Sequence, residues 1–289
     1  KYSSIYIGYG VQRYKNGGNS IRAIDALGAI TGSIGKKGGG VNYSNKVYPD
    51  VLNLDPYNSY KYASKEREFD LNEFPSFAKD NLKAIFISKA NPLNQWPNLN
   101  EFTKVFKSIE FKVCIDMFLT DTAKHCDLVI PCTNTLETED LLYTSMSNPY
   151  IVYNEKCVEP KHKLMDEYYF FRELAKKMEM KEYPYVPKKE YLAQIIKPLE
   201  ERGITLEKIK NEYVTIQEDD VAWKDLIFKT PSKKIEIYSE CAKKNNVSPT
   251  PVYINEKSSK LRLITTHPKR SLMSQSFKDI DTMAVANIS

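Results

Sequence analysis

The sequence lacks long hydrophobic runs, paired cysteines and, beyond residue 40, almost all glycine. No apolar stretch approaches the roughly 18 residues of a membrane span, and no secretory leader pattern is present. None of the five cysteines is spaced as C-x-x-C, which disfavours an iron–sulfur or zinc site built from this segment alone. Unpatterned thiols fit a reducing cytoplasm, so we expect a cytoplasmic protein. Cys114 and Cys132 lie within apolar runs and are expected to be buried as small hydrophobes.

The chain also lacks a basic stripe and a recognisable nucleophile motif. Its net charge is +5 and its lysines are scattered, so the electrostatic footprint of a nucleic-acid-binding protein is missing. The 3 histidines are far apart in sequence, so we predict no metal ligand within these 289 residues, and the sequence does not identify a catalytic residue. The carboxylates of Glu137, Glu139 and Asp140 follow one another closely in a loop and are expected to be solvated surface.

Glycine is concentrated at the amino-terminal end: only Gly203 lies outside the first forty residues. Around these glycines we expect a strand over Ser4–Ile7, a turn, and a helix over Ile21–Ile30. Asn19 or Ser20 is the expected N-cap of that helix, and Gly32 is its expected stop. This arrangement places backbone N–H groups after a strand and at a helix N-terminus, which suits phosphate binding.

A regular alternation of strands and helices follows an irregular stretch over residues 41–81. Short apolar runs predict strands over Ala84–Ile87, Lys112–Ile115 and Asp127–Pro131. Pro97 is expected to open the helix between the first two, and Thr120 or Asp121 to cap a short helix before the third. This order predicts an α/β fold with a doubly wound, mostly parallel sheet, a Rossmann-like dinucleotide-binding domain.

The rest of the chain is predicted to be helical or extended. Residues 150–158 read as an edge strand or hairpin, residues 228–237 as extended structure, and helices are expected over 164–178, 188–197 and 205–213. We therefore expect a cofactor-binding α/β region (1–145), a mainly helical region (146–242), a linker (243–260) and the start of a C-terminal β domain (261–289). A strand begun at Leu261 has too little chain after it to bury its faces, so we expect a piece of a longer protein.

Two features bear on the ligand. The run from Gly8 to Arg13 has only the first two glycines of G-x-G-x-x-G, and the next strand lies about seventy residues on, so NAD binding is disfavoured. Asp116 and the Asn91–Asn94 turn both follow predicted strands, where such sheets bind ligands. A carboxylate there can accept paired N–H donors such as those of guanine, or it can merely cap a turn.

Four stretches of the chain resemble, in order, the signatures of one enzyme family. The first runs through Gly8-Tyr9-Gly10-Val11-Gln12-Arg13, Asn16-Gly17-Gly18, Arg22-Ala23-Ile24, Thr31-Gly32-Ser33-Ile34-Gly35 and Gly38-Gly39-Gly40. The second comprises Asn91-Pro92, Asp116-x-Phe118-x-Thr120-x-Thr122-Ala123 and Asp127-Leu128-Val129-Ile130-Pro131 with Glu137. The third is Phe228-Lys229-Thr230-Pro231-Ser232-x-Lys234-Ile235-Glu236-Ile237-Tyr238, and the fourth is Leu263-Ile264-Thr265-Thr266-His267-Pro268 with Ser274-Gln275. Together they are similar to the molybdopterin oxidoreductase family, which includes dimethyl sulfoxide reductase and formate dehydrogenase.

The chain departs from the family pattern at a few positions. Ser33 stands where asparagine is commoner, Asp121 replaces a frequent glutamate, and Lys233 replaces a glycine. His125-Cys126 replace small residues.

The resemblance implies a complete protein that carries two molybdopterin guanine dinucleotides with molybdenum or tungsten and performs two-electron chemistry on a small-molecule substrate. It also implies an iron–sulfur cluster upstream of this segment in many members, and an iron–sulfur electron-transfer subunit as a partner. Gly10, Gln12, Arg13, Gly17 and Gly18 would line the pyrophosphate or pterin. The guanosine end would be held by Asn91, Asn94, Asp116, Thr120 and Thr122. The other cofactor would be approached by Thr266, His267, Ser274 and Gln275.

Two other functions remain open at this point. One is a metal-free electron-transfer or structural subunit with the same fold, which the retained Arg13, Gly17-Gly18 and Asp116 disfavour. The other is a plain nucleotide-binding module. By the resemblance, the segment alone should be inactive, because the metal ligand and the cysteine-rich motif would precede Lys1.

Overall fold

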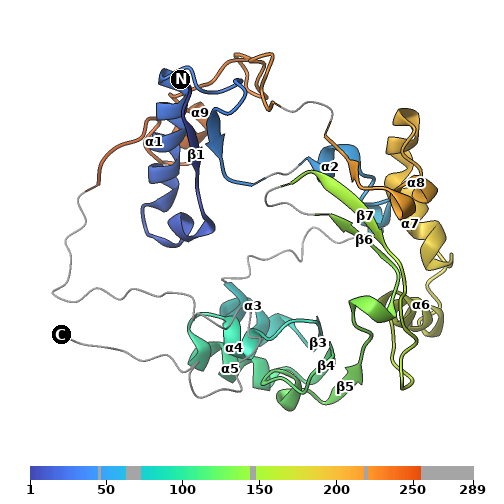
Figure 1. Ribbon diagram of the computed structural model, residues 1–289. Helices are drawn as coiled ribbons and strands as arrows, with labels where there is room; N and C mark the ends of the chain where they lie inside the picture. The colour runs from blue at the N-terminus through green and yellow to red at the C-terminus, as the bar shows by residue number, and fades with distance from the viewer. Residues whose placement is uncertain (45–46, 63–72, 144–147, 218–220, 255–289) are drawn as a thin grey trace, which may run out of the picture. The chain divides into compact units, whose positions relative to one another are not determined.

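A computed structural model describes residues 1–44, 47–62, 73–143, 148–217 and 221–254 (Figure 1). The chain divides into two compact units, and each is described by itself. The first unit comprises the described residues of Lys1–Asn53, Leu141–Val152 and Ile196–Arg262. The second comprises those of Leu54–Asp140 and Tyr153–Ile195.

The first unit begins with a β–α–β arrangement. Strand β1 (Ser4–Tyr6) pairs in parallel with β2 (Gly40–Asn42), and the 3-10 helix η1 (Tyr9–Arg13) and helix α1 (Gly17–Ile30) connect them. Helix α1 begins four residues before the predicted start, so the predicted caps Asn19 and Ser20 are wrong. Asn19 instead hydrogen-bonds the backbone of Val252, and Asn16 is the N-cap. Gly32, with φ at 64°, follows the helix end as predicted.

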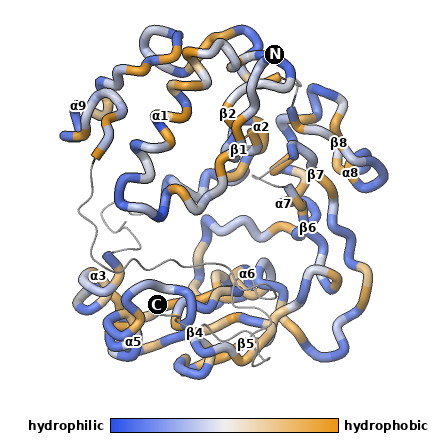
Figure 2. Tube along the Cα trace, turned by 60° about the vertical axis from the view of Figure 1, so that its left-hand side comes forward, coloured by the Kyte–Doolittle hydropathy of each residue, from blue (hydrophilic) through white to orange (hydrophobic). Residues whose placement is uncertain are grey.

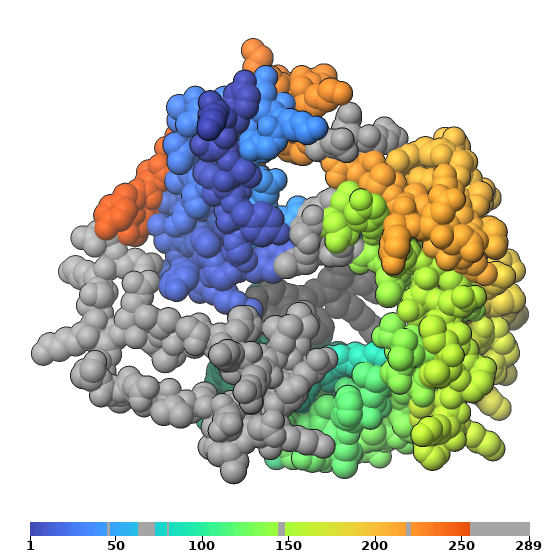
Figure 3. Space-filling view, in the orientation of Figure 1, coloured from blue at the N-terminus to red at the C-terminus, as the bar shows by residue number. Residues whose placement is uncertain are grey.

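The segment that ends the described chain packs on α1. After helix α9 (Glu240–Lys244), the two terminal nitrogens of Arg22 donate to the carbonyls of Ser248 at 2.9 Å and Pro249 at 2.6 Å. Figure 3 shows this orange-red segment against the blue atoms of the amino-terminal end. Residues 245–252, part of the predicted linker, are therefore hydrogen-bonded to a helix and do not run free in solvent.

The second unit contains a parallel sheet. Strands β3 (Ala84–Ser88), β4 (Phe111–Asp116) and β5 (Leu128–Pro131) are ordered β3-β4-β5, which confirms the three predicted strands. The helix predicted after Pro97 is α5 (Leu99–Ser108), but Asn98 is its N-cap and Pro92 opens a separate short helix, α4 (Pro92–Gln95). The 3-10 helix η5 (Ala123–His125) precedes β5 as predicted.

A helix that the sequence did not predict completes the core beside this sheet. Helix α3 (Phe74–Asn81) lies in the stretch expected to be irregular. Its Phe74 ring stacks on Phe102 of α5 with centroids 4.6 Å apart, and Phe102 stacks on the fully buried Phe106. Figure 2 colours the hydrophobic residues of α5 and β4 orange. The helix is stabilised by this packing, because a helix of 8 residues is too short to be stable alone.

A third sheet is ordered β6-β7-β8, from β6 (Asp140–Tyr143), β7 (Tyr150–Asn154) and β8 (Val214–Thr215). Strand β7 is therefore central, and the prediction of an edge strand there is wrong. The predicted helices are confirmed as α6 (Glu167–Lys177), α7 (Lys188–Ile196) and α8 (Leu206–Asn211). Short elements complete the described chain: α2 (Tyr48–Val51), η2 (Ser59–Tyr62), η6 (Thr135–Glu137) and η7 (Lys197–Arg202).

The predicted extended segment around Pro231 is a turn. The N–H of Phe228 donates to the carbonyl of Lys233 at 3.1 Å, and Lys233 has φ at 59°. This left-handed conformation favours glycine, which agrees with the glycine that the resembled family has at this position.

The fold class is confirmed in its coarse form, a mixed α/β protein with parallel sheets. The single doubly wound sheet is not seen among the described residues, whose strands form three separate small sheets. The strand at the amino-terminal end pairs with β2 instead of joining β3, because the α1 crossover returns the chain directly beside β1.

Candidate functional site

The carboxyl edge of the sheet β3-β4-β5 carries the residues expected to hold guanosine. Asp116 is the last residue of β4 and is 8% exposed. Its Oδ1 accepts a hydrogen bond from the N–H of Phe118 at 3.1 Å, and its carbonyl accepts one from Cys132 at 3.3 Å. Within the described chain, no donor pairs with its other carboxylate oxygen. Asp116 thus stabilises a turn through one carboxylate oxygen and has the other available as an acceptor. The two roles that the sequence allowed for it, turn residue and ligand acceptor, are therefore compatible.

Hydrogen bonds between Asn91 and Thr122 connect the turn before α4 to the loop that follows Asp116. The Oδ1 of Asn91 accepts from the Thr122 N–H at 3.1 Å and from its hydroxyl at 2.8 Å. The Thr122 hydroxyl in turn accepts from the Leu93 N–H at 3.0 Å. Thr122 is fully buried, so its role in this arrangement is to position Asn91 and not to offer its hydroxyl to a ligand.

Two other predicted residues lie at the same edge. The Thr120 hydroxyl accepts from the Ala123 N–H at 3.1 Å, but the N-cap of η5 is Thr122, so the predicted caps Thr120 and Asp121 are wrong. Asn94 is exposed, and its amide donates to Asp121 at 3.2 Å. The structure therefore brings Asn91, Asn94, Asp116, Thr120 and Thr122 together through the α4 turn and the loop between β4 and β5.

The glycine residues belong to the first unit and differ in what surrounds them. A Cβ on Gly17 would lie 2.1 Å from the Val11 carbonyl oxygen, so this glycine lets η1 approach the start of α1. A Cβ on Gly10 or Gly18 would meet nothing within 4 Å. Gln12 accepts a hydrogen bond from the Tyr43 hydroxyl at 2.8 Å. Packing explains Gly17, whereas the space that a side chain would occupy at Gly10 and Gly18 is open.

Of the remaining predicted residues, the structure describes only Arg13. Thr266, His267, Ser274 and Gln275 lie outside the described residues. Arg13 ends η1 and its side chain is exposed.

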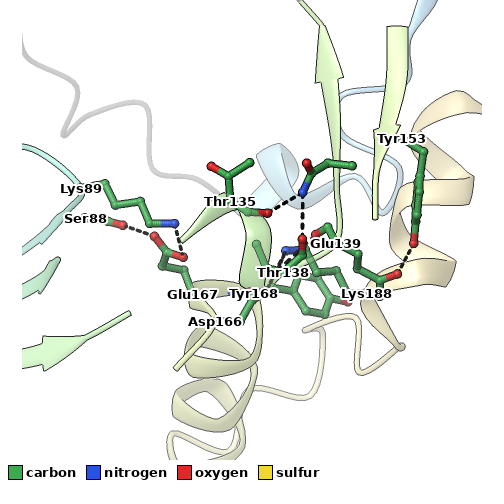
Figure 4. A network of polar contacts seen from close by, with 11 residues as sticks. Ser88, Lys89, Thr135, Thr138, Glu139, Tyr153, Asp166, Glu167, Tyr168 and Lys188 are labelled. Atoms are coloured by element: carbon green, nitrogen blue, oxygen red, sulfur yellow. Dashed lines mark hydrogen bonds and ion pairs between the residues drawn. The ribbon is translucent and has the colours of Figure 1, made fainter. Parts of the chain in front are cut away.

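A buried polar network in the second unit was missed by the sequence analysis (Figure 4). Lys188, the first residue of α7, places its Nζ 2.9 Å from Oδ2 of Asp166, and the two side chains are 9% and 12% exposed. The Thr138 hydroxyl bonds to the same carboxylate, and Lys188 reaches that hydroxyl at 3.0 Å. Burial would raise the pKa of Asp166, but its hydrogen bonds to Thr138 and Lys188 outweigh this and lower it.

Two of the carboxylates that were expected to be solvated, Glu137 and Glu139, accept hydrogen bonds within the protein. Glu139 accepts a hydrogen bond from Tyr153, and burial together with this carboxylate raises the pKa of the Tyr153 hydroxyl. Glu137 forms a capping box with Asn134, accepting from its N–H at 3.0 Å. The spacing Asn134-x-x-Glu137 is the sequence signal that would have identified this cap. The expectation of free surface carboxylates is therefore wrong for these two.

The cysteines behave as the sequence predicts. Cys114 and Cys132 are buried, and burial raises the pKa of Cys114 to about 12, so this thiol stays protonated at neutral pH. Among the residues that the structure describes, no three His, Cys, Asp or Glu side chains gather as a metal site would require. In the same residues, no helix is long and apolar enough to cross a bilayer.

The first two of the four signatures lie within the part of the chain that a comparison with known families matches. The family model for molybdopterin oxidoreductases matches residues 1–177. The chain belongs to the molybdopterin oxidoreductase family. Members of this family are oxidoreductases whose defining cofactor is a molybdopterin that holds molybdenum or tungsten.

Individual relatives agree with this assignment. The probable oxidoreductase YyaE of Bacillus subtilis is 34% identical over 94% of this chain and 43% of its own length. Formate dehydrogenase H of Escherichia coli is 27% identical over 62% of this chain and 28% of its own. The structure of acetylene hydratase from Pelobacter acetylenicus has a TM-score of 0.50 at 30% identity, over 60% of this chain and 24% of that one. The chain spans less than half the length of these relatives.

Proposed function

We propose that the chain binds the guanosine diphosphate end of a molybdopterin guanine dinucleotide and forms part of a molybdenum- or tungsten-dependent oxidoreductase that acts on a small molecule. The observation that carries this proposal is the buried Asp116 carboxylate at the carboxyl edge of a parallel sheet, with one oxygen left without a donor among the described residues. Membership of the family makes a guanine dinucleotide the ligand to test.

The hydrogen-bond acceptors at this edge of the sheet suit guanine. The base presents adjacent N–H donors, and an ionised carboxylate accepts two such donors with shorter and stronger bonds than a neutral acceptor. Asn91, held by Thr122, follows the neighbouring strand β3 and adds a polar group at the same edge of the sheet. The metal held by the pterin dithiolenes supplies the two-electron chemistry, while residues of this chain bind and orient the cofactor.

Finer features of the predicted protein are part of this proposal. Residues 1–145 form the Rossmann-like cofactor-binding region, with Gly10, Gln12, Arg13 and Gly18 near the pyrophosphate or pterin. Residues 146–242 are the mainly helical remainder of this module, and residues 243–260 are the linker that follows it. Residues 261–289 begin the C-terminal domain, in which Thr266, His267, Ser274 and Gln275 approach the second cofactor. An iron–sulfur cluster, an iron–sulfur electron-transfer subunit and a cytoplasmic location belong to the complete protein, of which this chain alone is inactive. The relatives include a dehydrogenase and a hydratase, so the substrate is proposed only as a small molecule.

Replacing Asp116 with asparagine should lower the affinity for GDP about 10- to 100-fold, the loss of a hydrogen bond to a charged group. The amide of asparagine would turn one acceptor into a donor that faces the donors of guanine. Isothermal titration calorimetry with GDP and with NAD measures the effect. Glu110→Gln, an exposed carboxylate at the opposite end of β4, is the matched control and should bind GDP as the wild type does. Unchanged GDP affinity in Asp116→Asn, or a preference of the wild type for NAD, would refute the assignment.

Metal analysis separates this proposal from a metal-free subunit with the same fold. We expect molybdenum or tungsten in the complete protein purified with its cofactor, and a lower metal content in its Asp116→Ala variant. Absence of both metals from the wild-type protein would favour the electron-transfer or structural alternative.

A further inference from the structure

A lysine stands beside Asp116 at the same edge of the sheet and plays no part in the signatures. Lys89 directly follows β3, and its backbone N–H donates to the carbonyl of Ile115 at 2.8 Å. Its side chain is 39% exposed, and its Nζ lies 3.0 Å from Oε2 of Glu167 (Figure 4). Ser88 donates to Oε1 of Glu167 at 2.9 Å, so the carboxylate is held from two sides.

The backbone at Lys89 is in an uncommon conformation. Its φ is 47°, in the left-handed region that a long side chain rarely adopts. Such residues persist only where the surrounding structure imposes them, and they cluster at ligand sites. The strain places a lysine ammonium group at the carboxyl edge of β3, where parallel sheets bind ligands.

A buried polar atom at this edge lacks a partner. Thr133, two residues after β5, is 4% exposed, and its hydroxyl has no hydrogen-bond partner within the described chain. Buried hydroxyls are normally satisfied, so an unpaired one indicates a water molecule or a ligand. Burial raises the pKa of the neighbouring Cys132, and the charges of Lys89, Glu167 and Asp116 all act on this thiol. The side chains of Lys89, Glu167 and Asp116 therefore all lie near Cys132, at the carboxyl edge of the sheet.

We propose that Lys89 binds the diphosphate of the nucleotide whose guanine meets Asp116, exchanging its contact with Glu167 for one with phosphate. This inference rests on the proposed function. A guanosine diphosphate brings negative charge to an edge that already holds the carboxylates of Asp116 and Glu167, so it needs a cation there. A lysine ammonium group is a compact point charge suited to phosphate. Glu167 holds the lysine in place until the phosphate competes for it.

Titration calorimetry of the 289-residue chain with guanosine, GMP and GDP tests this role. The wild type should bind GDP more tightly than guanosine. Lys89→Met should lower GDP affinity about tenfold, the loss of one charge-assisted contact, and leave guanosine affinity unchanged. Lys83→Met removes the same charge at the opposite end of β3 and should change neither affinity.

A second variant covers the case in which Lys89→Met does not fold. Glu167→Gln removes the competing carboxylate charge and should raise GDP affinity about two- to fivefold, with guanosine unaffected. The role of Lys89 would be overturned if Lys89→Met kept the full preference for GDP, or if it lost affinity for GDP and guanosine equally. It would also be overturned if Glu167→Gln showed no gain in GDP affinity. In each case the wild type would still bind guanosine. A wild type that binds neither guanosine nor GDP would instead overturn the proposed function itself.

Discussion

Replacing Lys188 with methionine should lower the free energy of unfolding by about 3–5 kcal/mol, the usual cost of leaving a buried charge without its partner. Asp166 keeps its charge at neutral pH because Thr138 and Lys188 lower its pKa despite its burial. Without Lys188, this carboxylate would remain among half-buried and buried residues with only neutral donors. Denaturant unfolding followed by circular dichroism measures the loss.

The neighbouring residue offers a matched control. Lys189 is exposed, so Lys189→Met removes the same charge and should change stability by less than about 0.5 kcal/mol. The double variant Lys188→Met/Asp166→Asn should recover most of the lost stability, because asparagine is neutral yet can still cap α6 through the Tyr168 N–H. A Lys188→Met variant as stable as the control would show that the ion pair contributes nothing.

Replacing Gly17 with alanine should destabilise the first unit by about 2–3 kcal/mol, as overpacking of a close contact does. The added Cβ would lie 2.1 Å from the Val11 carbonyl and 3.0 Å from the Gln12 Cα, and both are backbone atoms. Moving them would separate η1 from α1 and break the hydrogen bond from the Gly17 N–H to the Tyr14 carbonyl, now 2.9 Å. Thermal and urea unfolding of the chain measure this effect.

Gly18 provides the comparison that separates packing from ligand binding. A Cβ there meets nothing, and alanine is favoured over glycine in a helix by up to about 1 kcal/mol, so Gly18→Ala should be neutral or stabilising. If cofactor phosphate approaches this backbone, the same variant should lower the cofactor content of the complete protein. A loss of stability in Gly18→Ala equal to that in Gly17→Ala would contradict the structural distinction between the two glycines.

Much of the fold followed from the sequence where the pattern was strong. The runs in β3, β4 and β5 are short, apolar and bounded by turn residues, and the periodic helices α5 and α6 carry one apolar face. The misses have a different cause. Helix α3 lacks a strong period and exists because Phe74 packs on Phe102. The predicted start of α1 was wrong because Asn19, a good capping residue, lies within the helix and bonds to Val252, more than two hundred residues away.

The candidate site divides in the same way. The order of the signatures and the placement of Asp116 after a strand are local properties, so the sequence alone determined the family and the edge at which a ligand is proposed. Which residues face that ligand depends on burial and on partners distant in sequence. Only the tertiary structure decided that Thr122 is buried behind Asn91, that Gly17 is a packing glycine, and that Lys89 meets Glu167. Contacts between such distant residues leave no periodic trace in the chain, since they arise only when the elements pack.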